Sequence, residues 1–141
     1  MGIIKRSWVA AAFVIAASPF VSATVSAEGL DGSRDMVCAV MKVVGCVEGG
    51  GCVLGQAKDF DLPALVVFDT KQKVIRGTHE SGHKEVSPVK NMERSKDHLI
   101  LQGAEEGHGW DIAVDTKTGA MRGAVVGEAV SFLVSGTCTA L

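Results

Sequence analysis

Residues 98–126 have the sequence HLILQGAEEGHGWDIAVDTKTGAMRGAVV. Three short apolar segments lie in this stretch, and glycine together with acidic or polar residues separates each segment from the next. Short apolar segments bounded by turn-forming residues are typical of β-strands joined by tight turns. The stretch therefore predicts an antiparallel meander, in which each strand pairs with the one that precedes it.

The same pattern extends on both sides of this stretch, over residues 63–138. The predicted strands are Ala64–Asp69, Lys73–Thr78, Glu85–Met92, His98–Gly103, Gly109–Asp115, Ala120–Val126 and Val130–Gly136. We expect a mainly β fold with a minor α contribution, in which about 6–7 short strands form a sandwich or a small barrel-like sheet. Disulfide bonds and one N-terminal helix packed on the sheet complete the expected architecture.

Two segments of the predicted sheet repeat the same residues in register. Val67–Lys71 continues to Val74–Gly77, and Ala113–Lys117 continues to Ala120–Gly123, 46 residues further on. One interpretation is an ancient duplication. The other is that two hairpins use the same turn chemistry, because an aspartate at the start of a turn accepts hydrogen bonds from the backbone N–H groups that follow it. Both interpretations give these residues a structural role.

A helix is predicted before the sheet, over residues 31–45. Asp31 or Ser33 can cap its first turn, and Gly45 is a suitable end. The residues at helical spacing are Met36, Val37, Val40, Met41 and Val44. The β-branched valines favour a strand as the alternative. Residues 46–62 contain three consecutive glycines and are predicted to form a Gly-rich loop.

The first 27 residues have the pattern of a signal peptide. A positive start at Lys5 and Arg6 precedes the apolar segment Ser7–Val21, and cleavage sites follow Ala23 and Ala27, of which we favour the second. The apolar segment has 15 residues, whereas a membrane-spanning helix needs about 20. We therefore expect a single exported domain over residues 28–141, periplasmic or secreted, with no membrane span after cleavage.

Four cysteines follow the leader, and in an oxidising compartment an even set predicts two disulfides. They are Cys38, Cys46, Cys52 and Cys138. If the helix forms, Cys38 and Cys46 lie about 12 Å apart, too far for a disulfide. Of the two remaining pairings we favour Cys46–Cys52 with Cys38–Cys138. The pairing Cys38–Cys52 with Cys46–Cys138 stays open.

One motif is typical of metal chemistry. Residues 79–83 read HESGH, which matches the pattern in which two histidines on one helical face bind zinc and a glutamate activates water. That site needs a helix, but Gly77 and Gly82 flank and interrupt the motif, and Pro88 follows soon after. We predict a solvated loop, with no metal, cofactor or catalytic residue. The alternative is a zinc-dependent hydrolase or a surface metal site that uses His79, Glu80 and His83.

Residues 105–111, EEGHGWD, form an acidic, glycine-containing connection between two predicted strands. We expect a solvated hairpin turn, after which Trp110 enters the core at the start of the next strand. An ion-binding turn is the alternative.

Charge and composition exclude some functions. Without Lys5 and Arg6 the chain has 12 basic and 16 acidic residues, interspersed, with a net charge of −4. Nucleic-acid binding is not expected, because it needs a basic stripe. We predict a small exported, non-enzymatic binding or interaction module. Its partner would be a small apolar ligand in a barrel mouth, or a protein bound as by an inhibitor or as an accessory subunit of an envelope complex.

Overall fold

The computed structural model describes residues 28–78, 82 and 84–141, which form a mainly β structure of antiparallel strands. The mainly β, antiparallel prediction is therefore confirmed, and all seven predicted strands are present. The elements of the described residues are β1 (Met36–Val47), β2 (Cys52–Gly55), the 3-10 helix η1 (Ala57–Phe60), β3 (Leu65–Asp69), β4 (Val74–Gly77), β5 (Val86–Arg94), β6 (His98–Glu105), β7 (His108–Asp115), β8 (Ala120–Val126) and β9 (Val130–Ala140).

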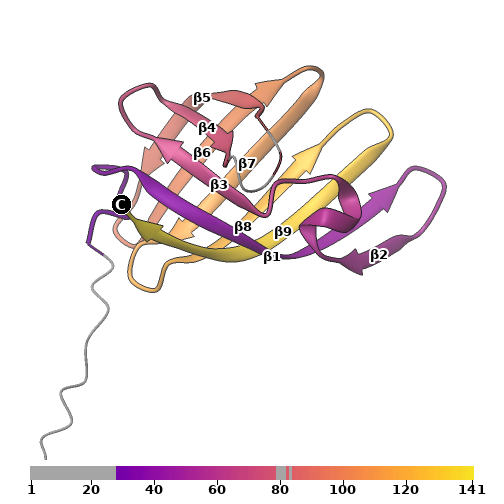
Figure 1. The fold of residues 1–141 in the computed structure, drawn as a ribbon, viewed down its shortest axis with the longest axis horizontal. Coiled ribbons are helices and arrows are strands. Elements are labelled where there is room, and N and C mark those ends of the chain that lie inside the picture. The colour runs from indigo at the N-terminus through magenta and orange to yellow at the C-terminus, as the bar shows by residue number, and fades with distance from the viewer. Residues whose placement is uncertain (1–27, 79–81, 83) are drawn as a thin grey trace, which may run out of the picture.

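The strands close into a barrel (Figure 1). From β3 to β9 each strand pairs with the next one along the chain, and β1 pairs with both β3 and β9. Eight of the nine strands therefore form a closed ring, and β2 lies outside it as an extension of β1. The sandwich that the sequence left possible is wrong, because β9 pairs with β1 along its whole length, from Met36↔Ala140 to Val47↔Val130.

On its other side, β1 pairs with two strands in succession. Its first part pairs with β3, where Met36 lies opposite Phe68. Its second part pairs with β2, where Val43 lies opposite Gly55. The ring therefore uses only the first part of β1 on this side. The remainder of β1, with β2 and the neighbouring η1, projects beyond the ring (Figure 1).

The core fills one end of the barrel. We call the end at which β1 begins the closed end, and the opposite end, which contains the β6–β7 turn, the open end. Because side chains alternate across a strand, every second residue faces the interior. At the closed end these inward residues are large and buried: Met36, Phe68, Leu99, Leu101, Val114 and Met121.

The segment before β1 covers the closed end. Leu30 is only 2 % exposed and belongs to the core cluster. Arg94 holds this segment in place, since its Nε donates to the Asp31 carbonyl at 2.6 Å and its guanidinium also donates to the Gly32 carbonyl at 3.2 Å. The Asp35 carboxylate accepts from the Thr70 backbone N–H at 2.9 Å and from the Thr70 hydroxyl at 2.7 Å. These hydrogen bonds lower the pKa of Asp35 below its ordinary value.

The two echoing segments form equivalent turns at the closed end. In the β3–β4 turn, Asp69 Oδ1 accepts from the N–H groups of Lys71 and Gln72, at 3.0 and 2.8 Å. In the β7–β8 turn, Asp115 Oδ1 accepts from Lys117 and Thr118, at 2.8 and 2.9 Å. Shared turn chemistry accounts for the repeated aspartates, and these residues have a structural role.

The predicted N-terminal helix over residues 31–45 is wrong, and β1 occupies most of that range. A bulge between Val40 and Lys42 contributes to the error, although Val43 is not part of the predicted helical face and Met41 of that face is 61 % exposed. The bulge adds one residue to the alternation, so the inward positions before and after it include Met36, Val40 and Val43, which are spaced as on one face of a helix. The β-branched valines, which favour strands, identify the element correctly. The predicted 46–62 loop likewise contains β2 and η1.

Both disulfides join residues that lie directly opposite each other on neighbouring strands. Cys38–Cys138 links β1 to β9, and Cys46–Cys52 links β1 to β2. This is the pairing that the sequence favours, although the argument from a helix does not apply. In a strand, which rises about 3.3 Å per residue, Cys38 and Cys46 are about 26 Å apart, so the excluded pairing is even less compatible with the fold. Within the described ranges, no helix has the length and apolar character needed to cross a membrane.

Candidate functional site

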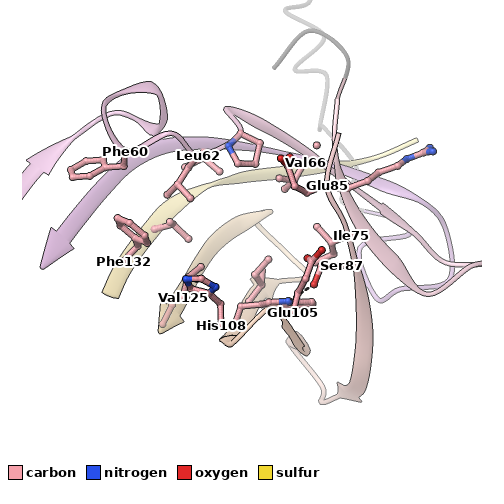
Figure 2. Close-up of a pocket in the computed structure, with 18 of the residues that line it drawn as sticks. Phe60, Leu62, Val66, Ile75, Glu85, Ser87, Glu105, His108, Val125 and Phe132 are labelled. Atoms are coloured by element: carbon pink, nitrogen blue, oxygen red, sulfur yellow. Dashed lines mark hydrogen bonds between the residues drawn. The ribbon is translucent and has the colours of Figure 1, made fainter. Parts of the chain in front are cut away.

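The open half of the barrel contains a cavity of about 540 Å³. Its lining is largely apolar and comes from strands on all sides of the ring (Figure 2). The aliphatic residues of the lining include Val40, Val66, Ile75, Ile112, Val125 and Val134. Met121 of the buried core also lines the cavity. A volume of this size lies within the range of about 300–1,000 Å³ that is typical of small-molecule sites.

Two inward rows of the barrel contain glycine toward the open end. Gly103 and Gly123 continue the inward rows of β6 and β8, which contain Leu101 and Met121 at the closed end. A Cβ added at Gly123 would lie 2.6 Å from the Asp111 carbonyl oxygen and 3.1 Å from a methyl group of Val134, so a side chain does not fit at this position. Neighbouring atoms occupy the space beside both glycines, and side chains such as Ile112, Val125 and Val134 bound the cavity.

Trp110 forms one wall of the cavity. Its indole ring lies across Gly103 of β6, where an added Cβ would come within 2.2 Å of Trp110 Cζ2. The indole N–H donates to Ser87 Oγ of β5 at 2.7 Å. The ring thus spans from β7 to β5 with its polar atom satisfied, and glycine at position 103 is required for this arrangement. As the sequence predicted, Trp110 packs against the core cluster, and its indole also lines the cavity.

An aromatic pair stands at the side of the open end near η1. Asp59 Oδ2 accepts from the Gln56 N–H at 2.7 Å, which fixes the start of η1. Phe60 at its end packs edge-to-face on Phe132, with ring centroids 5.7 Å apart. A Cβ at Gly45 would lie 2.5 Å from the Phe60 ring, so this glycine lets the ring approach β1. In Figure 2, Phe60 and Leu62 lie on one side of the cavity, and Phe132 and Val125 lie on the other.

Polar residues gather at the rim of the open end. The β6–β7 turn contains Glu106 and Gly107, whose φ angles of 46° and 82° are typical of a two-residue type I′ turn. This turn places Glu105 directly opposite His108. Both residues line the cavity, as do Glu85 and Ser87 of the neighbouring wall (Figure 2). The acidic turn recognised in the sequence is therefore a hairpin turn, as expected, and it lies at the mouth of the cavity.

The sequence-predicted metal motif lies mostly outside the described residues. His79, Glu80 and His83 belong to this part of the chain, whereas the nearby described residues Gly77 and Glu85 line the cavity. In the part of the chain that the structure describes, no group of three or more His, Cys, Asp or Glu residues is arranged to hold a metal ion. The zinc-hydrolase alternative stays a hypothesis, which metal analysis of the purified chain tests directly.

Sequence reasoning did not identify the residues that form the cavity. The available signal was the occurrence of polar residues such as Ser87 and Glu105 at positions of strands where large apolar residues otherwise face inward. That signal becomes readable only when the register of each strand is known. Comparison of the chain with protein-family models, with curated proteins and with solved structures gives no match. The interpretation of the site therefore depends on its own geometry.

Proposed function

We propose that this protein is a small exported, non-enzymatic binding protein that holds a small apolar molecule inside its barrel. The observation that supports this most strongly is the contrast within one interior. One end is packed and covered by Leu30, and the other contains a largely apolar cavity of about 540 Å³. A barrel that is packed at one end and hollow at the other can take up a ligand through the hollow end.

The chemistry of the lining favours an apolar guest. Each buried methylene group contributes about 0.8 kcal/mol of transfer free energy. About ten such groups supply about 8 kcal/mol before the cost of association is subtracted. Because about 8 kcal/mol without that cost would correspond to about 1 μM, we expect an affinity weaker than micromolar for a chain or ring system of this size. Pre-organised aromatic walls, such as the Trp110 indole held by Ser87, reduce the ordering cost of binding.

The proposed location outside the cytosol has two supports. All four cysteines are paired in disulfides, which are stable in oxidising compartments and rare in the cytosol. The leader over residues 1–27, which lies outside the described residues, has the composition of a signal peptide.

A fluorescent probe tests the binding function. N-phenyl-1-naphthylamine is uncharged at neutral pH and becomes strongly fluorescent in apolar surroundings. We expect its emission to rise saturably on titration with the protein, with one site per chain. Absence of saturable binding by this probe and by decanol would overturn the proposal.

Two neighbouring positions on β8 provide a matched pair of variants. Val125 lines the cavity, whereas Val126, the next residue, is 57 % exposed on the outer surface. We expect Val125→Trp to fill the mouth and reduce probe affinity at least tenfold, and Val126→Trp to leave it unchanged. If Val125→Trp folds and binds the probe as tightly as the parent, the ligand does not occupy this cavity.

A further inference from the structure

We propose that the preferred ligand of this cavity is an apolar molecule with a cationic head group, such as an alkyl or aromatic amine. Its apolar part would lie in the barrel, and its ammonium group would lie at the rim beside Glu105. This inference rests on the proposed binding function and specifies the class of ligand.

The position of Glu105 is the main support for a cationic head group. It follows Leu101 and Gly103 on the inward row of β6, and it lines the cavity. The type I′ turn at Glu106 and Gly107 fixes its backbone. The residue is half-buried. Over the described ranges of the chain, its carboxylate has no hydrogen-bond or ion-pair partner. A carboxylate at this position is therefore available to a ligand that enters the barrel.

Most of the other charged residues of the lining are acidic as well. Glu106 is adjacent in the turn, Glu85 lies at the start of β5, and Asp61 follows η1. Among the described lining residues, the only arginine or lysine is Arg76. Charges of one sign around a cleft with apolar walls produce a potential that attracts the opposite charge. The rim therefore favours a cation over an anion.

The apolar walls of the cavity increase the preference for a cationic over an anionic head group. A carboxylate paired with an ammonium group interacts more strongly where water is partly excluded than on an open surface. A fatty acid would instead place its own carboxylate next to Glu105, and this like-charge contact disfavours it. Aromatic rings at the same mouth, including Trp110 and Phe132, add a surface that attracts cations.

Displacement of N-phenyl-1-naphthylamine by three matched ligands tests the inference. Decylammonium, decanol and decanoate have the same tail and differ in the charge of the head group. They are compared below their micelle concentrations. We expect decylammonium to bind about fivefold more tightly than decanol, and decanoate to bind more weakly than both. Equal affinities for the amine and the alcohol, or a preference for decanoate, would overturn the inference and leave the binding function standing. If the probe and all three ligands fail to bind, the proposed function itself fails.

A variant pair assigns the preference to Glu105. We expect Glu105→Gln to abolish the fivefold preference for decylammonium while keeping the affinity for decanol, which also shows that the barrel is folded. Glu93→Gln removes the same charge from β5 near the closed end and should keep the preference. If Glu105→Gln retains the full preference, the head group does not lie beside Glu105.

Discussion

The closed and open ends of this barrel use the same strands in opposite ways. At the closed end, inward side chains such as Leu99 and Met121 fill the interior, and Leu30 seals it. At the open end, side chains such as Ile112, Val125 and Val134 line a cavity and do not fill the interior. The difference shows that one set of strands can surround a packed core at one end and a cavity at the other.

Asp35 and Asp115 at the closed end and Glu105 at the open end differ in whether their carboxylates have hydrogen-bond partners among the described residues. At the closed end, the carboxylates of Asp35 and Asp115 accept backbone N–H groups, which lower the pKa of each. Glu105 at the open end has no hydrogen-bond or ion-pair partner among the described residues. A carboxylate that is used by the fold contributes to stability, whereas a carboxylate left unpaired at a cavity mouth is available for binding.

The largest difference that we expect between the two ends comes from the disulfides. Cys38–Cys138 is buried in the core and joins residues 100 positions apart. Its replacement by two alanines should lower the free energy of unfolding by about 4–5 kcal/mol, because the loop in the unfolded chain is long. Cys46–Cys52 closes a separation of 6 residues outside the ring, and its replacement should cost about 2 kcal/mol. Denaturant titration measures both.

The reverse order, with the larger loss at Cys46–Cys52, would contradict the explanation by loop length. Probe binding separates the two variants further. The Cys46→Ala/Cys52→Ala protein should still bind N-phenyl-1-naphthylamine, because β2 is not part of the ring.

Two leucines provide the next comparison. Leu30→Ala removes a side chain that is 2 % exposed at the closed end, and we expect a loss of about 3 kcal/mol in the free energy of unfolding. Leu62→Ala removes a half-buried side chain that lines the cavity. Its cost should be about 1 kcal/mol, accompanied by weaker probe binding. Equal destabilisation by the two substitutions would mean that the open end is packed as tightly as the closed end.

Acid should weaken the closed end. Because the folded pKa of Asp35 lies below its ordinary value of 3.8, its stabilising contribution is present above that value. The contribution is lost as the pH falls toward the folded pKa. Melting temperatures measured from pH 7 to pH 3 should decrease at the acidic end, and Asp35→Asn should make this decrease shallower.

A second substitution checks the cause of the acid effect. Thr70→Val removes the hydroxyl donor to Asp35 and keeps the backbone donor, so it should have a smaller effect in the same direction. An unchanged acid profile in both variants would show that the Asp35 contacts do not contribute.

The smallest stability effect is expected at Glu105. Glu105→Gln should change the free energy of unfolding by less than about 0.5 kcal/mol, although it alters ligand preference. Denaturant titration of this variant beside Asp35→Asn compares an open-end carboxyl with a closed-end one. A large stability loss at Glu105 would show that its carboxylate supports the fold.

The seven strands from β3 to β9 could be predicted because their signals are local. Asp69 and Asp115 start turns with their own side chains, and the short apolar runs between turns alternate as strands do. The helix prediction failed in β1, where a bulge shifts the alternation by one residue and interrupts the regular strand pattern. Local patterns do not reveal such an insertion, because it depends on the pairing with β9.

Closure of the barrel and the cavity depend on contacts between distant parts of the chain. β1 meets β9 across most of the sequence, and the cysteines Cys38 and Cys138 were the only sequence feature that pointed to this pairing. The reason for glycine at position 103 is Trp110 of the next strand, whose ring lies across it and leaves no room for a Cβ. The residues of the rim were recognised as a turn, but their common direction into one cavity follows from the register of the whole ring.

The position of β2 outside the ring has a consequence for association between molecules. β2 pairs with β1 alone, and its residues Val53 and Leu54 are 63 % and 70 % exposed. An apolar strand with one unpaired edge invites addition of a strand from another chain. The Cys46–Cys52 bridge holds this short strand against β1. Its selective removal in the Cys46→Ala/Cys52→Ala variant should therefore release an apolar strand and promote polymerisation, while the ring stays folded.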